Sequence, residues 1–137
     1  MIAPNLLVRD LSRSARFYTQ SLGFDCAMVL TSDNNMVDDY SHREAVFATL
    51  LWQGHQLMLQ TRQHLQASGA PNTQNDPVLS GYLYLRDFAW DAIIHSLPPG
   101  ALVRGPKTQW YGMAEIIVRD PDGHTWVLGR REGAPPQ

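Results

Sequence analysis

Two distant segments of the chain repeat one local pattern, in which a strand-like run ends in Arg-Asp and a helical run follows. Residues 7–11 read Leu-Val-Arg-Asp-Leu, and residues 84–88 read Tyr-Leu-Arg-Asp-Phe. After each segment come a helical pattern of similar length, a short break and further strand-like runs. A repeat at a fixed offset indicates a duplicated supersecondary unit. We therefore predict one α+β domain built from two copies of a strand–helix–strands unit.

Hydrophobic alternation and turn residues place the predicted elements along both halves. Apolar runs bounded by turn residues favour strands, whereas apolar residues three and four positions apart favour helices. Strands are predicted at residues 2–8, 24–30, 44–52, 56–61, 79–86, 101–104, 113–119 and 125–130. Helices are predicted from a cap at Asp10 or Ser12 to Leu22, at 62–67 and at 88–97, with loops at 31–42 and 105–110. The single domain 1–137 then comprises module one (1–66), a Gly- and Pro-containing linker (67–78) and module two (79–131).

Bulk composition excludes several classes of protein. The chain has 137 residues, of which 44% are hydrophobic and 18% charged, and its formal net charge is −2. That balance is typical of a globular domain, and it lacks the clustered basic residues of a nucleic-acid-binding surface. No apolar run approaches the roughly 18 residues that a membrane span needs. The single cysteine, Cys26, cannot form an internal disulfide, which favours a reducing, cytoplasmic location.

Three segments identify a family resemblance that covers essentially the whole chain. They are VRDLSRSARFYTQSLGF at 8–24, GHQLMLQ at 54–60 and WYGMAEIIVRDPDGH at 110–124. With the half-repeat, they resemble the vicinal-oxygen-chelate superfamily, the glyoxalase/bleomycin-resistance/dioxygenase group. The resemblance implies two βαβββ modules whose curved mixed sheets surround a cleft, in a homodimer that can exchange modules between chains. It implies no single reaction, because the fold hosts both metal-dependent enzymes and metal-free proteins that sequester drugs.

The metal-ligand positions that the resemblance implies do not hold ligands in this sequence. Counting seven residues back from Asp10 and from Asp87 gives Ala3 and Ser80, and seven residues on from Asp120 gives Val127. Alanine and valine cannot bind a metal ion through their side chains, and serine is a poor ligand for these ions. The five histidines fall in turns, in a loop or on helices, so we expect them at the surface. We therefore predict a protein without a metal ion or other cofactor.

Strand alternation predicts which side chains face the cleft, because successive residues point to opposite sides of a sheet. The implied ligand positions face the cleft in this family, and they set the parity of the strands that carry them, whereas the polar Thr49 sets it for the strand at 44–52. Trp110, in the loop before the seventh strand, matches a tryptophan of the drug-binding members. The predicted ligand-binding residues are Asn5, Phe47, Thr49, Met58, Gln60, Tyr82, Tyr84, Trp110, Met113 and Glu115.

Aromatic rings with a few hydrogen-bonding groups suit a planar organic ligand. We therefore predict a metal-free protein that binds or sequesters a planar, antibiotic-like small molecule, as bleomycin-resistance proteins do. The alternative is a lyase or transferase resembling glyoxalase or fosfomycin-resistance enzymes, with a metal ion or with Glu115 as a base. A third reading is a subunit that only pairs with another domain. No catalytic residue is assigned, and neither nucleic acid nor a membrane is an expected partner.

Several of these residues could have a structural role in place of a ligand-binding one. Tyr82 and Tyr84 also suit packing in the core or at a dimer interface, because aromatic residues are common in strands. Glu115 could instead pair with Arg119 or Arg130. Cys26, on a strand, is expected to be a small buried apolar residue.

Overall fold

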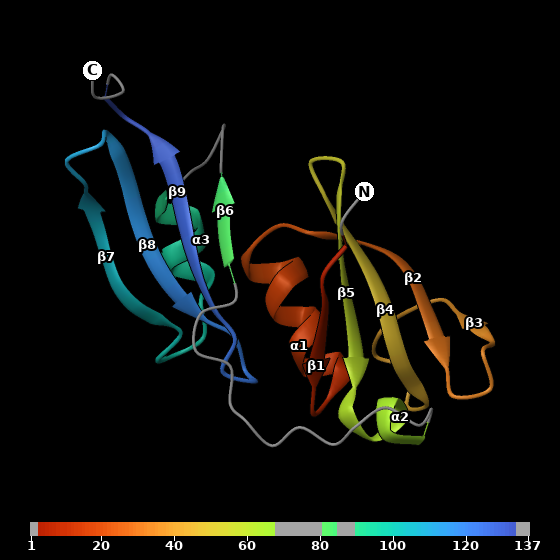
Figure 1. Cartoon of the computed structure of the whole chain (residues 1–137). Coiled ribbons are helices and arrows are strands. Elements are labelled where there is room, and N and C mark those ends of the chain that lie inside the picture. Colours follow the sequence, from red (N-terminus) through yellow and green to blue (C-terminus); the bar gives the residue numbers. More distant parts are fainter. Residues whose placement is uncertain (1–2, 68–80, 85–89, 134–137) are drawn as a thin grey trace. The chain divides into compact units, whose positions relative to one another are not determined.

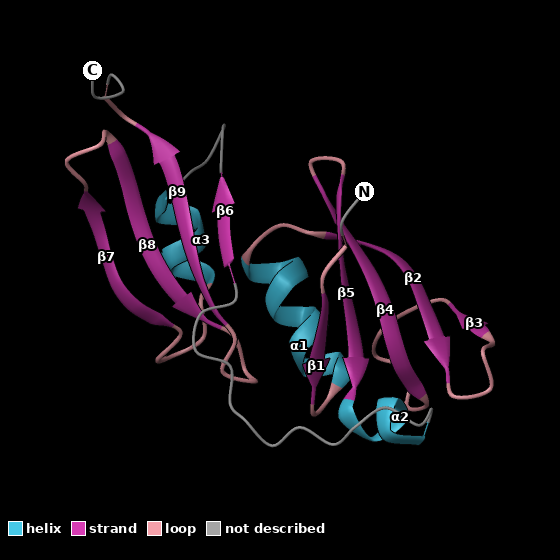
Figure 2. Cartoon of the chain, in the orientation of Figure 1, coloured by secondary structure: helices cyan, strands magenta, loops and turns pink. Residues whose placement is uncertain are grey.

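The structure, a computed structural model of the whole chain, describes residues 3–67, 81–84 and 90–133. It forms two compact units, Met1–Gln74 and Asn75–Gln137 (Figure 1). Each unit has its own mixed sheet, and helices lie in both: α1, η1 and α2 in the first and α3 in the second, as the α+β prediction requires (Figure 2). Together the units give the two βαβββ modules that the family resemblance implies. No helix among the described residues is long and apolar enough to cross a membrane.

The first unit is a five-stranded sheet in the order β1-β5-β4-β2-β3. Strand β1 runs parallel to β5, and the other neighbouring strands are antiparallel. The strands are β1 (Asn5–Val8), β2 (Asp25–Thr31), β3 (Met36–Val37), β4 (Ala45–Trp52) and β5 (His55–Thr61). The helices are α1 (Leu11–Arg16), the π-helix η1 (Phe17–Ser21) and α2 (Arg62–Ala67).

Helix α1 begins at the predicted cap and continues directly into η1. The side chain of Asp10 accepts a hydrogen bond from the Arg13 backbone N–H at 3.2 Å, which satisfies a donor of the first turn. The Leu22 N–H donates to the Phe17 carbonyl five residues earlier, which is the π-helical pattern. Gly23, at φ +81°, follows the helix, as expected of a residue that ends one.

One face of the first sheet packs under the helix and forms the core of this unit. Val8, Ala48, Leu50 and Leu59 are fully buried on this face. Helix α1 contacts both β4 and β5. The opposite face carries the alternate residues, and we call it the helix-free face of the first unit.

The second unit is a four-stranded sheet in the order β6-β9-β8-β7. Strand β6 is parallel to β9, and the others are antiparallel. Helix α3 lies against one face, where Arg130 of β9 sits 5.2 Å above the ring of Trp90 (Figure 1). The elements are β6 (Gly81–Tyr84), α3 (Trp90–Ser96), β7 (Leu102–Thr108), β8 (Met113–Arg119) and β9 (Thr125–Arg131). The helix-facing side chains of Ile116, Val118, Trp126 and Leu128 are buried, so the other side is the helix-free face of the second unit.

Two predicted loops contain strands. Residues 105–110 were expected to be a loop, but β7 continues to Thr108. The pairing of β7 with β8 shifts register between Arg104 and Lys107, which leaves Gly105 and Pro106 in an irregular stretch of the ladder. Proline lacks the N–H of a regular ladder and is tolerated at such bulges and on edge strands. The predicted loop 31–42 likewise contains the short strand β3.

Candidate functional site

On the first unit, strand register brings the predicted residues of three strands onto the helix-free face. Met58 lies opposite Asn5 on one side and Thr49 on the other. Gln60 lies in the same way between Leu7 and Phe47. Directly opposed residues share a face of the sheet, so the predicted parity is confirmed for these strands. Thr49 and Gln60 are buried, whereas Asn5 is exposed.

A row of polar side chains crosses this face. The Asn5 Nδ2 donates to the Gln60 Oε1 at 2.9 Å, and the Gln60 Nε2 lies 2.9 Å from the His64 Nδ1. His64 is on α2, and strand alternation could not place its ring beside Gln60. The row gives the face a fixed set of hydrogen-bonding groups, which suits recognition of a polar ligand atom.

On the second unit, the centre of the helix-free face is a carboxylate held by two phenols. The hydroxyl of Tyr82 on β6 donates to the Oε2 of Glu115 on β8 at 2.8 Å. The Tyr111 hydroxyl donates to the same oxygen at 2.7 Å. Glu115 is 9% exposed, whereas Tyr82 is 43% exposed. This pairing of Tyr82 with Glu115 joins two residues that the sequence placed on one face.

Gly129 of β9 lies between the strands of Tyr82 and Glu115. It pairs with Glu115 across β8 and β9 and with Tyr84 across β9 and β6. A Cβ atom at Gly129 would stand 1.8 Å from the hydroxyl oxygen of Tyr82. The missing side chain therefore leaves the room in which the Tyr82 phenol crosses β9.

Trp110 and Tyr111 form an aromatic corner beside this carboxylate. Their ring centroids are 5.3 Å apart in a T-shaped arrangement, and Trp110 is 83% exposed. Arg131 Nη1 donates to the Tyr111 backbone carbonyl at 2.6 Å, which fixes the loop. The hydrogen bond to Glu115, with burial and the negative charge of Glu115, raises the pKa of Tyr111 above its ordinary value.

Two of the implied metal-ligand positions carry side chains that have no atom able to coordinate a metal ion. Val127 lies between Tyr82 and Ile117 on the helix-free face of the second unit. Ala3 precedes β1 in the first unit, and Ser80 lies outside the described residues. Within residues 3–67, 81–84 and 90–133, no group of three or more His, Cys, Asp or Glu is arranged to hold a metal ion. The residues present therefore do not fit the metal that the family's enzymes use.

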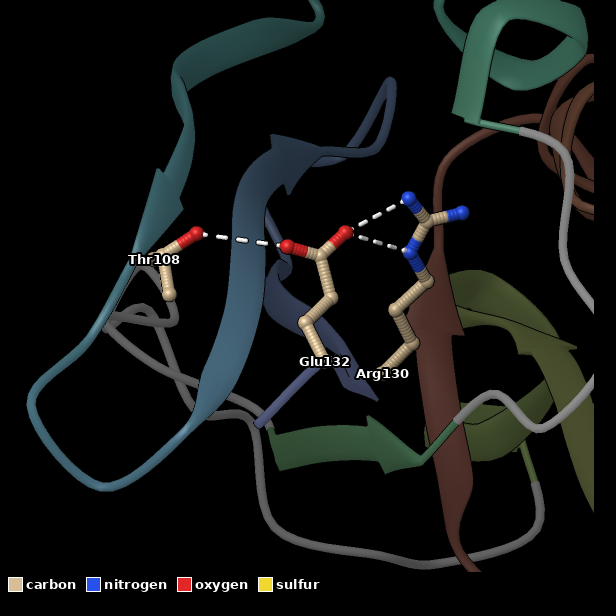
Figure 3. A network of polar contacts seen from close by, with 3 residues as sticks. All are labelled: Thr108, Arg130 and Glu132. Atoms are coloured by element: carbon tan, nitrogen blue, oxygen red, sulfur yellow. Dashed lines mark hydrogen bonds and ion pairs between the residues drawn. The ribbon is translucent and has the colours of Figure 1, made fainter. Parts of the chain in front are cut away.

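The prediction that Glu115 could pair with Arg119 or Arg130 was wrong. Arg130 lies on the helix side and pairs with Glu132 through its Nη2, at 2.6 Å from Oε1, while Thr108 donates to the other carboxylate oxygen at 3.3 Å (Figure 3). Arg119 shares the parity of Glu115 but is four residues along β8, about 13 Å away at the rise of a strand. The contacts come instead from Tyr111 in the loop before β8 and from Tyr82 on β6, two strands away from β8.

Two further expectations were also wrong. Cys26 was expected to be buried, yet it is exposed, although Leu50, its partner on β4, is fully buried. His124 was expected at the surface but is 7% exposed. Its backbone N–H donates to Asp120 Oδ1 at 2.8 Å, and the backbone N–H of Asp122 donates to the same oxygen at 2.8 Å. These bonds hold His124 against the turn at 120–123.

The other predicted residues have mixed surroundings. Met113 is buried on the helix-free face of the second unit, opposite Arg131. Tyr84 pairs with Gly129, and its side chain lies outside the described part of the structure. A separate hollow of about 410 Å³ in the first unit contains none of the predicted residues; it is lined by Met36, Val37, Asp38, Asp39, Ser41 and His42.

Comparison with known families assigns the chain to a superfamily. Residues 2–128 match the family model described as the Glyoxalase/Bleomycin resistance protein/Dioxygenase superfamily. The chain therefore belongs to this superfamily, as its three segments and half-repeat predicted. No curated protein matches the chain.

Solved structures share the fold at low sequence identity. A glyoxalase/bleomycin resistance protein/dioxygenase from Nocardioides has a TM-score of 0.66 and 19% identity, covering 100% of this chain and 88% of its own. TioX from Micromonospora sp. ML1 also has a TM-score of 0.66, with 18% identity over 95% of this chain and 97% of its own. A glyoxalase-related enzyme from Fulvimarina pelagi has a TM-score of 0.65 and 22% identity, covering 96% and 88%. These likenesses establish the fold, and the activity depends on the site.

Proposed function

We propose that this chain binds and sequesters a planar, partly aromatic small molecule without a metal ion, as bleomycin-resistance proteins of the superfamily do. The observation that carries the proposal is the pairing of Val127 with Tyr82. Where the metal-using members carry a glutamate, this face has an aliphatic side chain next to an exposed aromatic ring. Such a surface favours stacking and apolar contact over metal coordination.

The helix-free faces offer both kinds of contact that a planar ligand needs. Trp110 and Tyr82 are among the large apolar side chains that remain exposed. On the second unit Glu115, and on the helix-free face of the first unit Gln60, are polar groups held in place by hydrogen bonds. Binding sites for small molecules combine a mainly apolar lining with a few positioned polar groups. We propose that the protein acts in the cytoplasm as a homodimer, and sedimentation analysis tests the second point.

A thermal-shift screen with bleomycin, quinone antibiotics and peptide antibiotics tests the proposal. A ligand at a hundredfold excess over its Kd should add about 2.7 kcal/mol to the free energy of unfolding. Trp110→Ala should remove most of the shift. Val103→Ala is the matched control, because it also deletes an exposed apolar side chain of the second unit, at 44% exposure, from a position on β7 that is not among the predicted ligand-binding residues. Equal loss with both variants would contradict the assignment.

The competing function is a lyase or transferase of the same fold, and it is favoured by the presence of one buried carboxylate, Glu115, on the helix-free face. Elemental analysis of protein purified without chelators separates the two functions, because sequestration requires no metal ion. A stoichiometric, tightly bound metal ion would overturn the binding proposal. So would turnover of a glyoxal adduct or of fosfomycin that is lost in Glu115→Gln.

A further inference from the structure

The two oxygens of the Glu115 carboxylate have different surroundings. Tyr82 and Tyr111 both donate to Oε2, at 2.8 and 2.7 Å. Among the described residues, none donates to Oε1. The phenols therefore fix the orientation of the carboxylate and leave one oxygen as an acceptor for another donor.

The positive groups near this carboxylate do not neutralise it. Lys107 lies directly opposite Glu115 across β7 and β8, but it is exposed, and Arg130 forms an ion pair with Glu132. Arg131, which shares the face, donates to the Tyr111 carbonyl. The Glu115 side chain is only 9% exposed, so water has little access to it, and both phenols donate to Oε2. Burial of a charged group is costly unless the group is paired. A cation placed at Oε1 would offset that cost.

We propose that Oε1 of Glu115 binds a protonated N–H group of the ligand, so that the molecule recognised by the second unit is a planar aromatic cation. This inference rests on the proposed function, because it assumes that the face binds a planar molecule. Two features favour a flat cation over a small one such as ammonium. The phenol rings of Tyr82 and Tyr111 both reach the carboxylate through their hydroxyls, and the exposed ring of Trp110 packs against Tyr111. An aromatic ring attracts a cation and also stacks on a flat apolar surface, and a planar aromatic cation can make both contacts.

The test uses two probes of the same shape that differ in charge. At slightly alkaline pH, 9-aminoacridine is a planar cation that carries N–H donors, whereas acridine is neutral. Their affinities for the full-length protein are measured by titration calorimetry. We expect the cation to bind at least about tenfold more tightly, because a hydrogen bond to a charged group is worth about that factor. Glu115→Gln should reduce the affinity for 9-aminoacridine about tenfold and leave that for acridine unchanged.

Glu132→Gln is the matched control. It removes the same charge from the same unit, but Glu132 is already paired with Arg130 and Thr108 on the other side of β9 (Figure 3). The preference for the cation should therefore survive in Glu132→Gln. Circular dichroism and thermal unfolding establish that both variants fold.

The outcomes distinguish the inference from the proposed function. Equal binding of both probes by the wild-type protein would overturn the cation inference and leave the planar-ligand proposal standing. A preference that persists in Glu115→Gln, or that falls equally in Glu132→Gln, would also overturn it, because the charge selectivity would then arise elsewhere. Failure of the wild-type protein to bind either probe would count against both.

Discussion

The phenol of Tyr82 lies so close over Gly129 that a Cβ atom there would stand 1.8 Å from its oxygen and 2.4 Å from its Cζ. The backbone of Gly129 is outside the left-handed region, so alanine is compatible with its conformation. The three atoms nearest to the added Cβ all belong to Tyr82, so the tyrosine side chain would have to move. Gly129 thus acts as a positioning residue for the bond between Tyr82 and Glu115.

Gly129→Ala should displace the Tyr82 ring and break its hydrogen bond to Glu115. We expect a loss of about 1 kcal/mol in the free energy of unfolding, measured by urea denaturation. The same change made in a Tyr82→Ala background should cost nothing, because the clashing ring is absent, or should stabilise slightly through lower chain entropy in the unfolded state. An equal loss in both backgrounds would show that the tyrosine is not the obstacle.

Gly105→Ala should be more damaging, because two constraints act at that position. Gly105 has φ +102°, and an added Cβ would stand 2.5 Å from the backbone oxygen of Glu115. A backbone atom in a sheet cannot move aside as a side-chain end can. We expect a loss of more than about 2 kcal/mol in urea denaturation.

Gly54→Ala provides the control for Gly105→Ala. Gly54 also has positive φ, at +81°, but nothing lies within 4 Å of the added Cβ. Its cost should therefore be the conformational part alone, about 1 kcal/mol. Similar losses for the two variants would argue against the close approach of β7 and β8 at Gly105.

The pKa of Tyr111 should depend on the presence of the Glu115 carboxylate. Its phenol donates to Glu115, so the neutral form is favoured and the pKa of Tyr111 is raised above its usual value of about 10. Ultraviolet difference titration of the wild-type protein against Tyr111→Phe isolates this group. Glu115→Gln should lower the pKa of Tyr111 toward the ordinary value.

The same shift has a consequence for stability. A group whose folded-state pKa is raised stabilises the fold fully below its unfolded pKa, and that stabilisation is lost as pH rises through the folded value. The wild-type protein should therefore lose stability relative to Tyr111→Phe in the alkaline range above pH 10, and not near neutral pH. A difference that developed in acid would contradict this origin.

Cys26 should react slowly for an exposed thiol. Partial burial and the charge of Asp39 raise the pKa of Cys26, so less of the reactive thiolate is present at neutral pH. The rate of labelling with a disulfide reagent should rise with pH and should increase in Asp39→Asn. Asp33→Asn removes another exposed charge, from the turn between β2 and β3, and should leave the rate unchanged.

The parity of the strands could be predicted because it depends on a short-range rule. Met58, Thr49 and Asn5 share a face, and so do Tyr82 and Glu115, as a two-residue period requires. The helix boundaries near Asp10 and Gly23 follow from equally local capping chemistry.

What could not be predicted depends on contacts between segments distant in the sequence. Tyr111 sits in a loop, to which alternation does not apply, and the role of Gly129 appears only when β6 is placed beside β9. Composition and spacing carry no signal for either kind of contact.

The irregular stretch at Gly105 and Pro106 has a further consequence for the solubility of the protein. Strand β7 is an edge of the second sheet, and an unprotected edge offers free backbone groups to strands of other molecules. The register shift, the missing N–H of Pro106 and the exposed charges of Arg104 and Lys107 all oppose such pairing. These features disfavour the repeated addition of strands from other molecules to β7, which is the process that builds amyloid.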